Sequence, residues 1–391
     1  MEKQNEKHTV IIPSYNTLEH LKNTYKSLKE HAPNVSIIII DDASKDGTKK
    51  WLTELNDPLL LGISSKIRKG HTYWYDEGMR LAKTDIVSIL HSDMIIGPNY
   101  FENMLKHLKK GTIVCATRVE PPIHPAGKEK IVKDFGSEAN EILWDEFYSF
   151  VNEESKNQKG NTTKGIFAPW MLYKEDHLSI GGHDQRFTPF GYEDSDIFNR
   201  WILNGYKMIQ SRDALCYHLT CRGHRWNKGV GIENSDYNEI MTRCRKDFIR
   251  KWGDWIANDE FQYPIINPKY DIGFIVKNCN LQLLGLLELW CSTIYTDNDR
   301  MKYISLEQPN TSFNLSERVL PYDNEKNNRI LVEIDAKTFT SQDMGYISQF
   351  SKIISGDEEL KDHIGGTFEL SNMKITIMGL ETYENNLIKT Q

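Results

Sequence analysis

Over residues 9–90, short apolar runs alternate with amphipathic segments in a regular order. Residues 35–40 are apolar apart from Ser36, and the uninterrupted apolar run at residues 37–40 is typical of a strand buried on both faces of a sheet. Strands that alternate with helices in this way pair in parallel, so the order predicts an α/β fold with a doubly wound, mostly parallel sheet. The expected strands are residues 9–12, 35–40 and 86–90, and the expected helices are residues 18–31, a segment beginning near Thr48, and residues 74–82.

Polar residues follow each of the three expected strands. They occupy residues 13–16, where Pro13 is expected to end the first strand, residues 41–44 and residues 91–93. Ligands of open parallel sheets bind outside the carboxyl ends of the strands. We therefore expect these three clusters to form one binding site.

The composition is that of a folded globular protein. The 391 residues include 48 Lys and Arg against 55 Asp and Glu, and the net charge of −7 argues against general binding to nucleic acid. The first residues show no apolar leader, and the most apolar long stretch, residues 281–295, is too short to span a bilayer. The six cysteines form no C-x-x-C pair and are expected to be reduced. These features predict a soluble cytoplasmic protein with no transmembrane segment.

Two domains are expected. Residues 1–258 hold the alternating pattern, and within them the polar stretch 152–163 is expected to be a mobile loop. Residues 261–268, rich in Pro and Asn, read as a linker. The second domain, residues 259–391, is expected to be a smaller α+β domain for which a ferredoxin-like order fits. Its expected strands are residues 272–277, 302–307, 330–334, 367–370 and 374–378, and its expected helices are residues 281–295 and 342–354.

Four segments of the first domain carry a specific resemblance. They are HTVIIPSYN at residues 8–16, IIIIDDASKDGT at 37–48, DIVSILHSDM at 85–94 and GGHDQRFTPFGYEDSDIFNRWILNGY at 181–206. One such segment alone is weak, because Asp-Asp-x-Ser after a strand can cap any helix. In this order and at these separations they resemble glycosyltransferase family 2. The resemblance covers about residues 7–255 and implies a GT-A fold that binds a nucleoside-diphosphate sugar.

The resemblance implies a donor site near the first strands. Pro13 and Tyr15 are expected to line the nucleotide slot, with Tyr15 against the base, and Asp42 is expected to accept a hydrogen bond from the base. Asp41 lies beside Asp42, although a helix cap also explains it. For Tyr15 and Arg68 a structural role fits equally well. The remaining residues implied for ribose, phosphates or sugar are Arg68, Gly70, Asp76, Ser92 and Asp93.

Asp93 and His218 are the implied ligands of a divalent cation. A departing diphosphate needs a cation or basic donors beside it. The family's usual Asp-x-Asp is His91-Ser92-Asp93 here, so the first carboxylate is lost and the metal-contacting one remains. Mn²⁺ accepts imidazole more readily than Mg²⁺ does. We expect Mn²⁺ or Mg²⁺ at Asp93 and His218, with His91 as a less favoured ligand.

Glu193 and Asp194 are the candidate catalytic residues. An acceptor hydroxyl is a poor nucleophile and needs a carboxylate within hydrogen-bond reach. Acidic residues before an apolar helix are also favoured by the helix dipole alone. The resemblance assigns Asp194 as the general base and Glu193 as a contact to acceptor or donor sugar, while Asp196 is expected to brace the helix. One base facing an activated leaving group predicts inversion at the anomeric carbon.

Two further segments are candidates for an acceptor site and a lid. Trp170 precedes the Gly-Gly segment and is expected to stack on a sugar, although tryptophan is at least as often part of a core. Residues 222–231 are basic and rich in glycine, and they read either as a lid over the diphosphate or as a solvated loop. The candidates in this stretch are Arg222, His224 and Trp226.

Two other functions stay open at this point. A nucleotidyltransferase that makes activated sugars usually carries a glycine-rich basic loop after its first strand, which residues 13–16 lack. A binding protein that has lost activity is suggested only by His91. For a transferase, the expected donor base is uridine and the expected acceptor is a glycan or another hydroxyl-bearing molecule. The second domain is expected to recognise the acceptor or to form a homo-oligomer.

Overall fold

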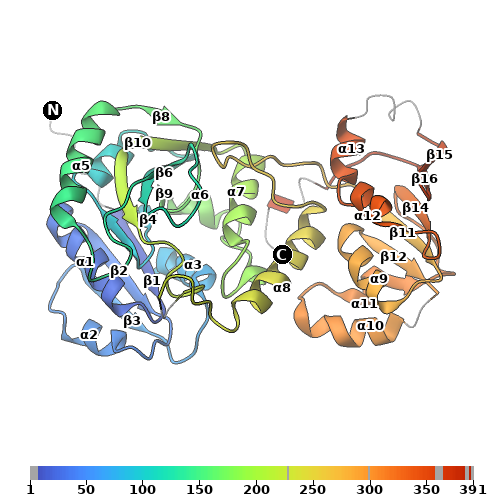
Figure 1. The fold of residues 1–391 in the computed structure, drawn as a ribbon, viewed down its shortest axis with the longest axis horizontal. Coiled ribbons are helices and arrows are strands. Elements are labelled where there is room, and N and C mark those ends of the chain that lie inside the picture. The colour runs from blue at the N-terminus through green and yellow to red at the C-terminus, as the bar shows by residue number, and fades with distance from the viewer. Residues whose placement is uncertain (1–7, 227–228, 298–299, 357–363, 384–386, 389–391) are drawn as a thin grey trace. The chain divides into compact units, whose positions relative to one another are not determined.

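The computed structural model describes residues 8–226, 229–297, 300–356, 364–383 and 387–388. The chain forms two compact units (Figure 1). The first is built from residues up to 240 together with 258–264, and the second from 241–257 together with residues from 265 onward. Within the described ranges, no helix has the length and apolar character needed to cross a membrane.

A sheet with ten described strands forms the centre of the first unit. The strands are β1 (His8–Ser14), β2 (Ser36–Asp41), β3 (Leu60–Ser64), β4 (Ile86–Ile89), β5 (Met94–Ile96), β6 (Thr112–Glu120), β7 (Lys130–Val132), β8 (Thr162–Thr163), β9 (Trp170–Tyr173) and β10 (Lys207–His218). The main path runs β3-β2-β1-β4-β9-β6-β10-β5. The first four strands pair in parallel, and β9 is antiparallel to both of its neighbours. The predicted mostly parallel sheet is confirmed.

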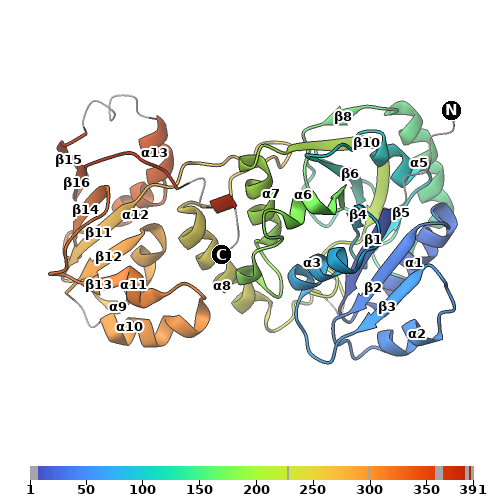
Figure 2. The ribbon, with the colours of Figure 1, turned by 180° about the vertical axis from the view of Figure 1, so that it is seen from behind.

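Helices cover both faces of this sheet (Figures 1 and 2). They are α1 (Leu18–His31), α2 (Thr48–Glu54), α3 (His71–Leu81), α4 (Tyr100–Leu105), α5 (Trp144–Asn157), α6 (Lys174–Leu178) and α7 (Glu193–Leu203). Val10 and Ile12 of β1 cluster with the buried leucines of α1. Ile11 faces α3, because a Cβ built on Gly78 would lie 2.4 Å from the Ile11 side chain. Successive residues of a strand point to opposite faces, so the sheet is wound on both sides as predicted.

The strand β1 continues through Pro13, whereas the sequence predicts its end there. The partner strand β4 pairs with β1 only as far as Ile11. The missing N–H of Pro13 therefore faces the side on which β4 has already ended, where a proline is tolerated. On the other side, the Ser14 carbonyl accepts a hydrogen bond from the Asp42 N–H at 2.9 Å. This pairing brings the residues after β1 and β2 together.

Residues 152–163 are not the predicted mobile loop. The first half of this stretch belongs to α5 and its last two residues form β8. The helix buries Phe147 and Val151, which lie one turn apart. The polar residues that suggested a loop form the solvent face of this helix. An amphipathic helix needs only a narrow apolar stripe, and two large residues at helical spacing supply it here.

The second unit has its own sheet, of six strands in its described part. They are β11 (Ile272–Lys277), β12 (Thr293–Thr296), β13 (Val319–Pro321), β14 (Ile330–Asp335), β15 (Thr367–Leu370) and β16 (Met373–Ile377). The order is β13-β12-β11-β14-β16-β15, and the first four strands of that order pair in parallel. A smaller C-terminal sheet domain is confirmed, but the ferredoxin-like order is wrong. Helical crossovers join β11, β12 and β13, and such connections make strands parallel.

Two local predictions fail in this unit. Residues 302–307, predicted as a strand, lie in helix α10 (Arg300–Glu307), which buries Tyr303 and Glu307 one turn apart. Residues 281–295, predicted as one helix, hold α9 (Leu281–Leu287), a short 3₁₀ turn and most of β12. Short apolar runs do not distinguish a helix from a strand. Here the pairing with β11 makes the last part of the run, β12, a strand. The remaining helices are α8 (Tyr237–Trp252), α11 (Leu315–Arg318), α12 (Ser341–Ile347) and α13 (Phe350–Gly356).

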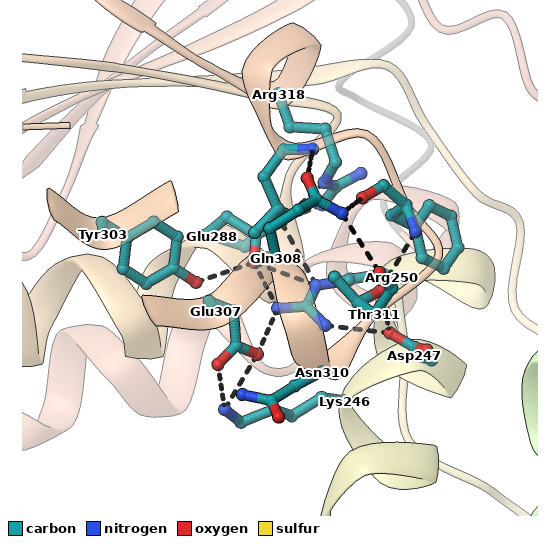
Figure 3. Close-up of polar contacts among 12 residues, drawn as sticks. Lys246, Asp247, Arg250, Glu288, Tyr303, Glu307, Gln308, Asn310, Thr311 and Arg318 are labelled. Carbon is teal, nitrogen blue, oxygen red and sulfur yellow. Dashed lines mark hydrogen bonds and ion pairs between the residues drawn. The ribbon is translucent and has the colours of Figure 1, made fainter. Parts of the chain in front are cut away.

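A buried network of charges ties α8 to the rest of the second unit (Figure 3). The Arg250 guanidinium donates hydrogen bonds to Glu288 at 2.8 Å, to Glu307 at 2.8 Å and to Asp247 at 2.9 Å. Arg318 donates to Glu288 from the other side at 2.6 Å. Burial alone would raise the pKa of Glu288, but Arg318 and Arg250 lower it to about 2. The network holds this carboxylate in its charged form within the core.

Replacing Arg250 by methionine is expected to destabilise the second unit. The change leaves acidic groups buried with less opposing charge, which costs about 3–5 kcal/mol when one partner of a buried pair is removed. Urea unfolding followed by fluorescence measures the loss. Lys246→Met is the matched control, because Lys246 reaches Glu307 from a partly exposed position and exposed pairs contribute only about 0–1 kcal/mol. If the free energy of unfolding fell equally in the two variants, the larger contribution expected from the buried ion pairs of Arg250 would be contradicted.

Candidate active site

A cavity lies at the carboxyl ends of β1, β2 and β4, where the sequence predicts the polar clusters to meet. Its lining also includes residues that the sequence analysis did not single out, among them His71 and Tyr75 of α3 and Phe190 before α7. The cavity thus joins the strands of the expected donor site to the segment that leads into α7. The sequence-predicted residues that line it are Pro13, Tyr15, Asp42, Arg68, Gly70, Ser92, Asp93, Arg222 and His224.

Asp42 fastens the loop before α3. Its carboxylate accepts hydrogen bonds from the backbone N–H groups of Lys69 and Gly70, each at 2.7 Å, and from Trp74 Nε1 at 2.7 Å. Gly70 has a φ of +88°, and a Cβ at this position would lie 2.2 Å from Pro189 Cα. Only glycine fits this close approach. Asp42 therefore positions the edge of the cavity, and its contact to a base stays a prediction.

Arg68 covers one face of the Tyr15 ring. Its guanidinium lies 4.1 Å from the ring centroid and pairs with Asp236 at 3.0 Å. Stacking of a cation on an aromatic face is favourable by about 0.5–2 kcal/mol. A nucleotide base that stacks on the same face of Tyr15 must displace Arg68.

Asp93 and His218 meet because β5 pairs with the end of β10. Met94 lies opposite His218 in that antiparallel pair, and Asp93 Oδ1 is 3.6 Å from His218 Nε2. Glu120 Oε1 lies 3.0 Å from His218 Nδ1, which leaves Nε2 turned toward Asp93. A carboxylate behind an imidazole is the usual support of a metal-binding histidine. The donor set therefore fits a divalent cation between Asp93 and His218.

The sequence analysis missed Glu120. The only sequence signal is a glutamate at the end of an apolar strand, and that glutamate is 2% exposed in the fold. Arg118 and Lys130 both donate hydrogen bonds to its carboxylate at 2.8 Å. These partners keep Glu120 charged behind His218.

His91 is the third group beside the candidate cation site. The possible ligand atoms of His91, Asp93 and His218 all lie within 4.8 Å of one another. Burial, followed by the nearby His218 and His71, holds the pKa of His91 well below its usual value. A neutral imidazole is the form that binds metal.

Glu193 and Asp194 begin α7. Tyr192, the residue before them, has a φ of +70°, a conformation that non-glycine residues adopt rarely. Burial and then the charge of Glu193 raise the pKa of Asp194 to about 7. Burial alone would raise the pKa of Glu193, but His71, whose Nε2 lies 2.6 Å from Glu193 Oε1, lowers it. Two adjacent carboxylates with pKa values pushed apart are typical of acid–base sites.

Tyr75 connects the two sides of the cavity. Burial raises the pKa of its hydroxyl well above the usual value, and the charges of Asp194, Glu193 and Asp93 raise it further. Tyr75 itself lines the cavity, as does Asp93.

Two family models match segments of the chain. Residues 9–178 match the family model described as glycosyl transferase family 2. They form a family 2 glycosyltransferase domain. A second model, described as the N-terminal domain of galactosyltransferase, matches residues 151–221. The resemblance found in the sequence motifs is confirmed.

Relatives of the family 2 domain are distant. The chain is 24% identical over 255 residues to "Uncharacterized glycosyltransferase YfnE" of Bacillus subtilis (strain 168), covering 54% of this chain and 64% of that protein. It is 21% identical over 266 residues to a validoxylamine A glucosyltransferase of Streptomyces hygroscopicus subsp. jinggangensis (strain 5008), covering 62% of this chain and 60% of that protein. The chain thus spans less than two thirds of the length of these relatives. Among solved structures, the chain aligns with the mannosyltransferase PcManGT from Pyrobaculum calidifontis in complex with GDP-Man and Mn²⁺. The TM-score is 0.40 and the sequence identity is 21%, and the alignment covers 56% of this chain and 59% of that chain.

Asp76 lies beneath the cavity of the family 2 domain rather than in its lining. It is 2% exposed and accepts hydrogen bonds from His183 Nδ1 at 2.7 Å, from the His183 N–H at 2.9 Å and from His177 Nε2 at 2.9 Å. Asp76 is not among the described residues that line the cavity, and its contact to ribose or phosphate stays a prediction. The hydrogen bonds of Asp76 tie α3 to the Gly-Gly turn before α7.

Trp170 is part of the core of the family 2 domain. It is 1% exposed and packs edge-on against Trp201, with ring centroids 5.0 Å apart. Its ring is almost fully buried in the described structure, and the acceptor contact stays a prediction. The alternative, a core tryptophan, is the one that the burial supports.

The predicted lid residues divide into two groups. Arg222 and His224 line the cavity, and the Arg222 N–H lies 3.4 Å from Asp93 Oδ2. The Arg222 side chain turns away and pairs with Glu138 at 3.4 Å. Trp226 lies outside the cavity lining and stacks on His124 at 6.0 Å. Residues 227–228 of the predicted lid lie outside the described ranges.

Asp41 and Asp196 have structural partners in the family 2 domain. Asp41 Oδ1 accepts a hydrogen bond from the Ser44 N–H at 2.9 Å, which closes the turn after β2. Asp196 pairs with Arg200 at 2.8 Å one turn along α7, which is the predicted brace. Neither contact tests a direct role of Asp41 toward a nucleotide.

Proposed function

We propose that this chain transfers a sugar from a nucleoside-diphosphate sugar to an acceptor hydroxyl, with Asp194 as the general base. The main support is a cavity lined by Asp93 and His71, in a chain whose residues 9–178 match glycosyl transferase family 2. His71 Nε2 lies 2.6 Å from Glu193 Oε1, so it joins this cavity to the start of α7, where Asp194 follows Glu193. Asp93 lies beside an oriented imidazole, where a cation can be held. Asp194 has a pKa suited to accepting a proton near neutral pH.

On the donor side, Asp93 and His218 would hold a divalent cation. When bound, the cation supplies Lewis-acid stabilisation of the charge that develops on the departing diphosphate. We propose Mn²⁺ before Mg²⁺, because one of the two ligands is an imidazole. Pro13 and Tyr15 are proposed to line the base slot, with Arg68 moving from the Tyr15 ring onto the donor.

On the acceptor side, Asp194 takes the hydroxyl proton as the oxygen attacks the anomeric carbon. The bond from that carbon to the diphosphate breaks while the new glycosidic bond forms, and a single displacement inverts the configuration. Proton NMR of freshly formed product is expected to show the anomeric configuration opposite to that of the donor. A product that keeps the donor configuration would refute direct displacement.

Analysis of the released nucleotide tests the reaction class. A glycosyltransferase releases a nucleoside diphosphate, whereas a nucleotidyltransferase that makes activated sugars releases pyrophosphate. We expect the diphosphate. Detection of pyrophosphate from a nucleoside triphosphate and a sugar phosphate would favour the nucleotidyltransferase instead.

A thermal-shift panel identifies the donor. A ligand that binds only the folded state stabilises it by RT ln(1 + [L]/Kd), or about 2.7 kcal/mol at a hundredfold excess over Kd. We propose uridine as the donor base, and a glycan or another hydroxyl-bearing molecule as the acceptor. The panel consists of nucleoside diphosphates and their sugars, with and without Mn²⁺. No shift with any nucleotide, together with no hydrolysis of the sugars, would favour a binding protein that has lost activity.

The role of the second unit is also a proposal. We propose that it recognises the acceptor or mediates self-association, and that the protein acts in the cytoplasm, where its six free cysteines stay reduced. A truncation after residue 258 is a poor test, because it would leave Arg250 without Glu288. Light scattering of the full chain across concentrations tests self-association directly.

A further inference from the structure

His71 stands between the two halves of the candidate active site. It is the first residue of α3 and directly follows Gly70, whose N–H is held by Asp42 on the donor side. Its Nε2 lies 2.6 Å from Glu193 Oε1 at the start of α7. His71 also lines the cavity. A single side chain thus joins the loop beside the donor strands to the helix that carries the base.

Glu193 uses only one of its oxygens within the protein. Oε1 pairs with His71, whereas the buried Oε2 has no hydrogen-bond partner among the described residues. A buried carboxylate oxygen without a partner is costly, by about 1–3 kcal/mol or more. A hydroxyl group of a bound sugar satisfies such an oxygen. The geometry therefore leaves Oε2 for a ligand and Oε1 for His71.

We propose that His71 is a positioning residue for glycosyl transfer. It fixes one oxygen of Glu193 so that the other can bind a sugar hydroxyl, and when it is protonated it offsets the negative charge of Glu193 beside Asp194. This inference rests on the proposed transferase function, because it assigns Asp194 the role of base. His71 itself does not touch the reacting atoms.

The charges of Glu193 and His71 determine the direction in which each substitution shifts the pKa of Asp194. The charge of Glu193 raises the pKa of Asp194, and the charge of His71 lowers it. The titratable or charged groups that interact with Asp194 include Glu193, His71, Tyr75, Cys115, Arg118 and His183. Those around His71 include Glu193, Asp194, Asp42, Tyr75, His91 and His224. Removing His71 or Glu193 therefore shifts the titration of the base in opposite directions.

The test is a pair of pH–rate profiles. His71→Gln keeps a hydrogen-bond donor but loses the charge. The acidic limb of its kcat/KM profile is expected to move to higher pH by about one unit, because a nearby charge shifts a pKa by about 1–3 units. At pH 7 the rate then falls about fivefold, because the ionised fraction of a base with a pKa of about 7 drops from about one half to about one tenth. In Glu193→Gln the acidic limb is expected to move down. A residue that only supports the fold would lower the rate without opposite shifts of the limb.

Two controls separate this inference from the proposed function. His31→Gln removes a histidine that lies 3.9 Å from Glu30 at the end of α1. The acidic limb of the pH–rate profile of this variant is expected to match that of wild type. NMR titration of the labelled histidines needs no activity, and the pKa of His71 should fall by about one unit in Glu193→Gln. Suppose that wild type transfers sugar, and that His71→Gln has the same rate and the same acidic limb of its pH–rate profile as wild type. The inference about His71 is then refuted, whereas the proposed function stands. If wild type transfers nothing, the proposed function fails, and the NMR titration still decides whether His71 holds Glu193.

Discussion

Replacing Asp194 by asparagine should reduce kcat by about 10²–10⁴-fold, the usual contribution of a general base. Asparagine has nearly the same shape but cannot accept the proton of the acceptor hydroxyl. Nucleotide affinity, measured by calorimetry, should stay close to wild type, because Asp194 is not among the described residues that line the cavity around Tyr15 and Asp42. Residual turnover above about a tenth of wild type would count against Asp194 as the base.

The same assignment predicts how activity depends on pH. Asp194 has a pKa raised to about 7 and accepts a proton only when it is ionised. The rate should therefore rise as pH increases through about 7 and level off above it, and the rise should be absent in Asp194→Asn. Asp145→Asn is the matched control, since Asp145 is an exposed acid in the first turn of α5. A helix-start acid contributes only about 0.3–1 kcal/mol through the dipole, so this control should leave kcat unchanged.

Replacing Asp93 by alanine should lower kcat by about 10²–10³-fold, comparable to the loss of a main charge-stabilising group. The variant loses one of the two oriented ligands at the candidate cation site, and His218 alone binds a hard cation weakly. Chelation of wild type should give a similar loss, which added Mn²⁺ should reverse. The measurement is initial rate against free Mn²⁺ for both proteins.

Chelated wild type and Asp93→Ala are informative together. If both act through the same cation, chelator should add little to the loss already present in the variant. Mn²⁺ should rescue chelated wild type but not the variant. Full activity in chelator, combined with undiminished activity of Asp93→Ala, would exclude metal assistance at this position.

Local patterns were sufficient for much of the first sheet. The helix at Leu18–His31 begins and ends where its 3.6-residue period predicts, and β2 follows the uninterrupted apolar run. Both signals are local, because they depend only on which side chains face a core. The same reasoning fails at residues 302–307 and 152–163. There the apolar content fits more than one structure, and partners distant in sequence select the helix.

The candidate site was predictable where a residue lies at the carboxyl end of a strand or shortly after it. Pro13, Asp42 and Asp93 line the cavity because the carboxyl ends of β1, β2 and β4 meet at one edge. Asp76 and Trp170 were predicted on the same basis of sequence order, but both are buried by residues that arrive from later segments. The sequence analysis missed Glu120 and His71 because neither belongs to a motif that suggests a functional role. Their importance lies in contacts to His218 and Glu193, and no spacing in the sequence encodes those contacts.

The sequence by itself determined the alternation of strands and helices, the edge of the sheet at which the cavity lies and the family that the first domain matches. These follow from periodicity and from the order of motifs, which are properties of neighbouring residues. The tertiary structure decided which acids reach the cavity and which only brace it, and it paired His71 with Glu193 and Glu120 with His218. The physical reason is that burial and the approach of charges set hydrogen bonding and pKa values, and both depend on chain segments that meet only after folding.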